Sequence, residues 1–200
     1  MKFFSKNTRF NILIAIWIIA ISIAVGSFHS WHLISFKPPK ISKFDQAVEN
    51  KWGMVHFLAP ECSCSLSIVD DLIERNKLNT KLPNEIVYLV GRQNESITKK
   101  LLKAKYIVKK ITEKQVKSKN LQINGVPLLL IHDENKVVKY VGGYSDRMIT
   151  PNTKFKISSL YKKVTNGQKV KELPIFGCAV SKEIKKILDP LGFKYGEENG

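Results

Sequence analysis

The chain has 200 residues, with 33 Lys or Arg against 17 Asp or Glu and a formal net charge of +16. This length suits one domain of ordinary size with an appendage. The charge does not indicate a nucleic-acid partner, because phosphate binding relies on clustered Lys and Arg, whereas here the lysines are scattered among acidic and apolar residues.

The appendage is an apolar segment near the N-terminus. Residues 12–25 read ILIAIWIIAISIAV, and their flanks extend the apolar stretch to about 19 residues, enough for a helix to cross about 30 Å of hydrocarbon. Lys2, Lys6 and Arg9 precede it without any acidic residue, which favours a cytoplasmic N-terminus. We therefore expect residues 1–28 to form a cytoplasmic tip and a transmembrane signal-anchor in a bacterial cytoplasmic membrane, with the remainder facing the periplasm or the cell exterior.

A cleaved signal peptide is the alternative, because small residues at 24–27 offer a cleavage point. The uncleaved anchor is favoured, since the apolar run exceeds a usual signal core and no clean A-x-A follows it. Residues 29–43 contain Pro38 and Pro39 among mixed polar residues and are interpreted as a linker.

The pattern of apolar residues and breakers predicts the elements that follow. In chain order they are a short helix over 44–51, a buried strand over 53–59, a helix capped by Ser63 or Ser65, a strand over 85–90, a helix over 95–105, a short strand over 107–111, a helical turn over 113–119, an antiparallel pair of strands over 128–132 and 136–141, and helices over 152–166 and 181–188. This order predicts an α/β domain over 44–170, followed by a C-terminal extension over 171–200.

Two of the three cysteines, Cys62 and Cys64, lie where the first of these strands turns into a helix. Three cysteines are too few for a disulfide-stapled miniprotein, so the close pair points to chemistry. A helix N-terminus presents unpaired N–H groups and a partial positive charge, and both favour thiolate over thiol. Cys62 is therefore the expected nucleophile, exposed to partners, with Cys64 as its near partner. The acidic neighbour Glu61 opposes this effect.

The segment FLAPECSCS over residues 57–65 resembles the thioredoxin superfamily, in which F-x-A-P-x-C closes the first strand and a redox cysteine opens the helix. The segment LQINGVP over residues 121–127, with the hairpin after it, resembles the part of that fold where a cis-proline precedes a hairpin. The resemblance implies a thioredoxin-like fold, with a central mixed sheet flanked by helices. It also assigns substrate contact to Val126 and Pro127.

The third cysteine, Cys178, lies in the sequence LPIFGC, which resembles the P-x-F-G-C ending of RedB-type thioredoxin-like proteins. Those proteins also carry a C-x-C-S pattern near the N-terminus. The usual C-x-x-C is absent here, because Ser65 stands at the second cysteine's position. Two possibilities stay open: a strained Cys62–Cys64 disulfide with an oxidising tendency, or Cys62 acting alone with Cys178 as the candidate resolving thiol.

The leading hypothesis is a membrane-anchored extracytoplasmic thiol-disulfide oxidoreductase. Its partners would be protein thiols and disulfides and a redox partner protein, and it requires no bound cofactor or metal. A Cu(I)-binding thioredoxin-like metallochaperone is the alternative, since two thiolates with Cys178 or a histidine are soft ligands. A peroxidase and a non-catalytic thioredoxin-like binding module are further alternatives. His56 alternates along a strand and is interpreted as a packed residue.

Overall fold

A computed structural model describes the chain except for residues 1–5, 33, 46–50, 119–120, 190–194 and 196–200. The chain divides into two units, residues 1–34 and residues 35–200. The first unit contains helix α1 (Lys6–His32). Within the described residues, no helix combines the length and the apolar character needed to cross a bilayer, so the predicted transmembrane helix is not confirmed.

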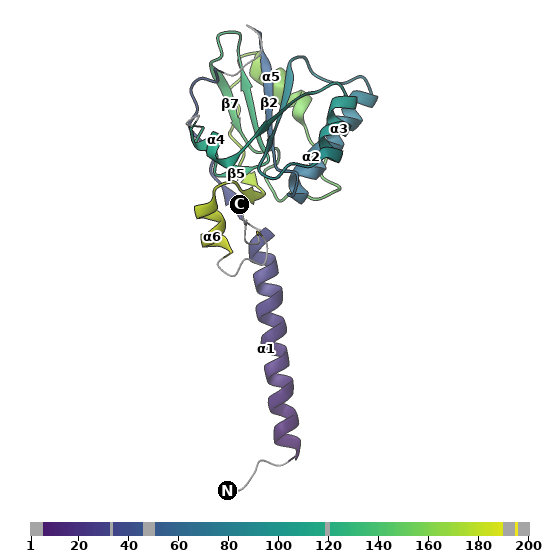
Figure 1. Cartoon of the computed structure of the whole chain (residues 1–200), viewed down its shortest axis with the longest axis vertical. Helices are drawn as coiled ribbons and strands as arrows, with labels where there is room; N and C mark the ends of the chain where they lie inside the picture. Colours follow the sequence, from purple (N-terminus) through teal and green to yellow (C-terminus); the bar gives the residue numbers. More distant parts are fainter. Residues whose placement is uncertain (1–5, 33, 46–50, 119–120, 190–194, 196–200) are drawn as a thin grey trace. The chain divides into compact units, whose positions relative to one another are not determined.

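The second unit is built on a five-stranded mixed sheet (Figure 1). The strands follow the order β4-β3-β2-β6-β7, and their bounds are β2 (Gly53–Leu58), β3 (Glu85–Val90), β4 (Ile107–Ile111), β6 (Leu128–His132) and β7 (Val138–Gly142). Strands β2, β3 and β4 are parallel, whereas β6 and β7 run antiparallel to their neighbours. All five strands were predicted from the sequence.

Helices cover both faces of this sheet. They are α2 (Ser63–Lys77), α3 (Glu95–Lys103), α4 (Glu113–Ser118) and α5 (Ile157–Thr165). A further helix, α6 (Lys182–Leu188), contributes no buried residue. Along β2, Met54 and Leu58 pack with apolar residues of α2, α3 and α5, while Val55 and Phe57 pack on the opposite face with Val116 of α4. Side chains of a strand alternate between its two faces, so a continuous apolar run buries both. The expected central mixed sheet flanked by helices is confirmed.

Two predicted helices differ from the structure. The segment over 44–51 falls largely on residues outside those described, although Phe44 itself is buried against Phe57. Helix α5 begins at Ile157 instead of residue 152, because a turn comes first, in which the Thr150 N–H donates to the Thr153 hydroxyl at 2.8 Å.

Four two-residue strands were not predicted. They are β1 (Ser35–Phe36), β5 (Gly125–Val126), β8 (Ile175–Phe176) and β9 (Cys178–Ala179), and they form the antiparallel pairs β1 with β8 and β5 with β9. Residues 173–180, which carry β8 and β9, are called the C-terminal strap below. Its residues Ile175, Ala179 and Val180 are buried, so the strap is part of the packed domain.

Candidate functional site

Cys62 is the residue from which α2 starts. It is the N-cap of that helix, with extended backbone angles (φ −96°, ψ 117°), and its carbonyl accepts a hydrogen bond from the Leu66 N–H at 3.0 Å. The strand before it ends at Leu58, and Pro60 lies in the turn between the two elements. The sulfur is therefore held where the first helical N–H groups lack intrahelical partners, an environment that favours a thiolate.

Cys178 lies directly across a strand pair from the proline loop. In the pairing of β5 with β9, Val126 is opposite Cys178, and the Val126–Pro127 peptide bond is cis. The Cys62 sulfur lies 3.9 Å from the Val126 carbonyl oxygen. The structure thus brings together four residues singled out from the sequence: Cys62, Val126, Pro127 and Cys178.

Backbone contacts hold the C-terminal strap in place. The Gly143 N–H donates to the Leu173 carbonyl at 2.9 Å, and the Val180 N–H donates to the Asn124 carbonyl at 3.0 Å. At Gly177 the two chains approach so closely that an added Cβ would overlap the Val126 carbonyl oxygen. Only glycine fits at such an approach, so the strap lies against the proline loop in a defined register.

Cys62 is not exposed, contrary to the sequence-based expectation. Its relative exposure is 1%, and it belongs to a buried cluster with Ala59, Val126 and Val180, against which Cys64 and Cys178 pack. Cys64 and Cys178 are half-buried, and all three cysteines are thiols. The strap supplies part of this cover through Val180 and Cys178.

The environment of Cys62 favours its charged form. Hydrogen bonds from Cys178 and then from Cys64 are the largest influences that hold the pKa of the Cys62 thiol well below its usual range. Burial acts in the opposite direction, and the backbone amide and hydroxyl of Ser65 lower the pKa further. The neighbouring thiols and Ser65 thus favour the thiolate form of Cys62 by donating hydrogen bonds to it within a buried site.

Ser65 and Tyr195 are parts of the site that the sequence did not assign to it. The buried Ser65 accepts a hydrogen bond from the Ala59 N–H at 3.1 Å, which leaves its own O–H to serve Cys62. The Tyr195 hydroxyl accepts from the Ala179 N–H at 3.1 Å, and burial raises the pKa of Tyr195 to about 12. The position of Ser65 after the C-x-C was a usable signal, whereas nothing local marked Tyr195.

Cys64 faces a different neighbour. Its sulfur lies 3.9 Å from the carbonyl oxygen of Ile149, in the loop between β7 and α5. It occupies the first turn of α2, and it packs against the apolar clusters on both faces of the sheet. Cys64 therefore contacts Cys62 from the helix side, while Cys178 contacts it from the strap.

Comparison with known proteins finds neither a matching family model nor a matching curated protein. Solved structures do resemble the chain. A hypothetical protein from Sinorhizobium meliloti 1021 is 12% identical, with a TM-score of 0.50 over 74% of this chain and 91% of its own. An uncharacterized conserved protein from Geobacillus kaustophilus is 15% identical, with a TM-score of 0.49 over 74% of this chain and 90% of its own.

The likeness is one of fold. A thiol:disulfide interchange protein of the thioredoxin family from Chlorobium tepidum TLS is 16% identical, with a TM-score of 0.43 over 66% of this chain and 98% of its own.

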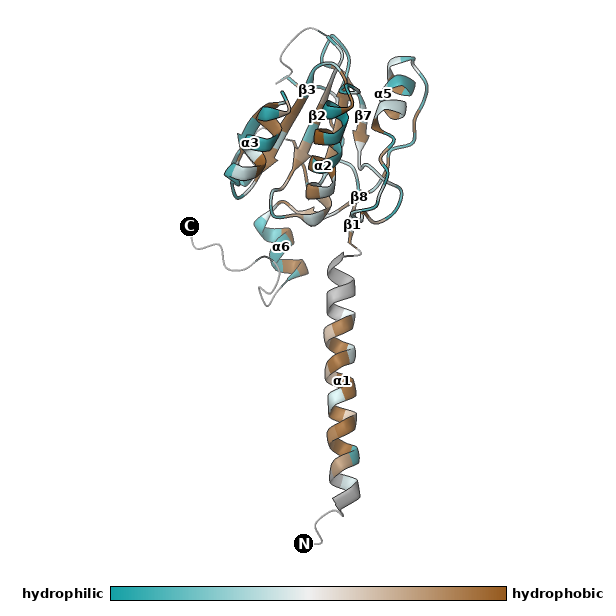
Figure 2. Ribbon diagram, turned by 90° about the vertical axis from the view of Figure 1, so that its right-hand side faces the viewer, coloured by the Kyte–Doolittle hydropathy of each residue, from teal (hydrophilic) through white to brown (hydrophobic). Residues whose placement is uncertain are grey.

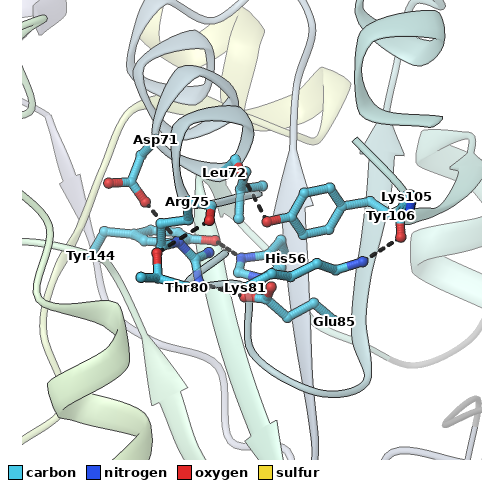
Figure 3. A network of polar contacts seen from close by, with 10 residues as sticks. All are labelled: His56, Asp71, Leu72, Arg75, Thr80, Lys81, Glu85, Lys105, Tyr106 and Tyr144. Atoms are coloured by element: carbon cyan, nitrogen blue, oxygen red, sulfur yellow. Dashed lines mark hydrogen bonds and ion pairs between the residues drawn. The ribbon is translucent and has the colours of Figure 1, made fainter. Parts of the chain in front are cut away.

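A second polar group, separate from the thiols, is buried between α2 and the sheet (Figure 3). Arg75 donates to Glu85 at 2.8 Å and to Asp71 at 3.1 Å. His56 lies 3.4 Å from Glu85 through Nε2, and 2.7 Å from the Tyr144 hydroxyl through Nδ1. Arg75 lies in the last turn of α2, whereas Cys62 precedes its first turn.

These contacts explain the pKa values within the group. Burial is the main reason that the pKa of His56 is lowered. Burial also opposes ionisation of Glu85, but hydrogen bonding to His56 and the charge of Arg75 outweigh it and lower the pKa of that carboxyl. The group is a compensated ion pair with a neutral histidine, so His56 is a packed residue, as the sequence indicated.

No metal site is found among the described residues: none of their His, Cys, Asp and Glu side chains form a group of three or more that is arranged to hold an ion. The three cysteines are close enough to influence one another, but they do not form such a group.

Proposed function

We propose that the chain is a thioredoxin-like thiol-disulfide oxidoreductase that exchanges disulfides with protein substrates, with Cys62 as its reactive thiolate. The observation that carries the proposal is the position of Cys62 at the start of α2, in contact with two other thiols and with its pKa lowered by them. A structural buried cysteine acts as a small apolar residue and has no need of such partners.

Thiol-disulfide exchange uses a thiolate twice, as the attacking sulfur and as the leaving group. A low thiol pKa makes Cys62 a good leaving group from any disulfide it enters. The cis Val126–Pro127 loop lies beside it, as the thioredoxin resemblance implies for a substrate-contact segment. Both Cys64 and Cys178 contact Cys62, so either can form an internal disulfide with it.

The test is a redox titration of the full-length chain in glutathione buffers, followed by acid quenching and mass spectrometry of the trapped thiols. We expect one reversible internal disulfide that includes Cys62 and is abolished by Cys62→Ser. The Cys64→Ser and Cys178→Ser variants are titrated in parallel. The variant that loses the disulfide identifies the cysteine that pairs with Cys62. Absence of any reversible disulfide at Cys62 across the whole buffer range overturns the proposed function.

A second part of the proposal concerns location: the N-terminal segment holds the chain at the cytoplasmic membrane, and the oxidoreductase domain works outside the cytoplasm. Large apolar side chains of α1 are exposed, among them Leu13 at 65% and Trp17 at 67%. Figure 2 shows hydrophobic residues along much of this helix. We expect the chain to sediment with membranes through a high-salt wash and to be released by detergent. The matched control lacks residues 1–34 and should stay in the supernatant. Release of the full chain by salt alone contradicts this part.

A further inference from the structure

The two sulfurs that meet across the strap differ in access. Cys62 is 1% exposed and lies beneath the pairing of β5 with β9, whereas Cys178 is half-buried on the strap. The backbone edge of Val126, which an extended substrate segment would use, is already occupied by Cys178 and its neighbours. A substrate sulfur can therefore approach the Cys178 sulfur more readily than the Cys62 sulfur.

We infer that Cys178 is the sulfur that contacts substrate: the oxidised protein carries a Cys62–Cys178 disulfide, and a substrate thiolate attacks it at Cys178. The inference rests on the proposed function and specifies how its site operates. Cys62 is the buried leaving group, and the C-terminal strap is the element that presents the disulfide.

A substrate thiolate forms a bond to the Cys178 sulfur, the Cys62–Cys178 bond breaks, and Cys62 leaves with the electron pair as a thiolate. A second substrate thiolate then attacks the substrate sulfur of the mixed disulfide, and Cys178 leaves and takes up a proton. Two substrate thiols become a disulfide, and the protein disulfide becomes two thiols. A disulfide of the glutathione class reoxidises the protein by the reverse exchanges.

The surroundings of Cys62 suit a leaving group. Exchange is faster when the departing thiol has a low pKa. After Cys62 departs, Ser65 and Cys64 remain as hydrogen-bond partners of the thiolate, since both lie on α2 and do not move with the strap. The buried site thus accepts the charge without help from water.

The geometry favours Cys178 over Cys64 as the disulfide partner. The Cys64 sulfur has a second neighbour away from Cys62, since it lies 3.9 Å from the Ile149 carbonyl oxygen. Cys178 instead comes from a separate segment opposite Val126, whose carbonyl oxygen lies 3.9 Å from the Cys62 sulfur. The strap is held on both sides of Cys178, through Leu173 and Val180, so this sulfur is presented in a constant position.

The experiment maps where glutathione attaches. The oxidised full-length chain is mixed with reduced glutathione, quenched with acid over a time course of seconds, alkylated and analysed by peptide mass spectrometry. We expect the first adduct on Cys178, together with release of the Cys62 thiol, in both the wild type and Cys64→Ser. Cys178→Ser should lose the internal disulfide at Cys62.

A first adduct on Cys62 or Cys64, or an internal Cys62–Cys64 disulfide in the wild type, overturns the inference but leaves the proposed function standing. A chain without any reversible disulfide at Cys62 overturns both. Because the wild type is mapped directly, the result does not depend on whether the variants fold. Far-UV circular dichroism of each variant shows whether it has the same secondary structure as the wild type and can be compared with it.

Discussion

Cys178 lies opposite Val126 in a two-residue antiparallel pairing, so a residue far along the chain is placed beside the proline loop and the start of α2. This relationship explains three properties of the site together. Cys62 is buried, and its thiol has the Cys178 sulfur as a neighbour in addition to that of Cys64. The edge of the proline loop is paired within the chain.

The first prediction concerns the pKa of Cys62. Replacing Cys178 with Ala should raise this pKa toward the ordinary value of about 8.5, because the largest influence that lowers it is removed. Cys64→Ala should raise it by a smaller amount. The measurement is the ultraviolet absorbance of the thiolate against pH in the reduced chain, with Cys62→Ser as the baseline. An unchanged transition in Cys178→Ala would show that the two sulfurs do not interact in solution.

The second prediction concerns the strap. Gly177→Ala places a Cβ against the Val126 carbonyl oxygen and Pro127, so the strap has to move away. We expect a lower yield of the Cys62–Cys178 disulfide and faster alkylation of Cys62 by iodoacetamide. Gly26→Ala is the matched control, because its Cβ meets nothing within 4 Å. Equal alkylation rates in the two variants would mean that the strap does not cover Cys62.

The third prediction concerns the buried ion pair. Glu85→Gln leaves the Arg75 guanidinium without its 2.8 Å carboxylate partner, and breaking a buried pair in this way costs about 3–5 kcal/mol of unfolding free energy. Glu95→Gln is the control, because its pairing with Lys99 at 3.6 Å is exposed and should contribute little. Urea unfolding of the two variants and the wild type gives the comparison, and similar midpoints for both variants would contradict the prediction.

The fourth prediction concerns pH. Burial lowers the pKa of His56 in the folded chain, while the unfolded chain binds a proton at about pH 6.5. The stabilisation from neutral His56 is therefore fully present above about pH 6.5, and it is lost as the pH falls through the folded pKa. Unfolding free energies measured from pH 7.5 down to about pH 5 should decline, and His56→Gln should flatten that decline. If the unfolding free energy of the His56→Gln variant declines with pH as steeply as that of the wild type, the decline belongs to other titrating groups.

Much of the fold was predictable because its long elements carry regular patterns. The continuous apolar run ending at Leu58 and the spaced apolar positions of α2 determine a strand and a helix locally. The junction of these two patterns predicts that Cys62 lies at a helix start, and this prediction depends on local sequence alone. The cis bond before Pro127 followed from the thioredoxin resemblance, and the structure contains it.

The strap was not predictable in the same way. Strands of two residues, such as β8 and β9, have no periodicity, and their pairing depends on partners far away in the sequence. That pairing contributes to the burial of Cys62, so the position of Cys62 at a helix start was predictable and its cover was not. Tyr195 was missed for the same reason, since its contact with Ala179 is set by the path of the chain after the strap.

The late position of the strap in the chain also imposes an order on maturation. Cys62 and Cys64 leave the ribosome well before Cys178, so for part of synthesis the helix start exists without its third sulfur. During that interval an oxidant can join the two early cysteines only to each other, and exchange with a foreign disulfide can join either of them to another molecule. In the inferred mechanism, arrival of the strap then supplies Cys178 as the partner of Cys62. Chains stalled or truncated before Gly177 should therefore collect unproductive adducts at Cys62.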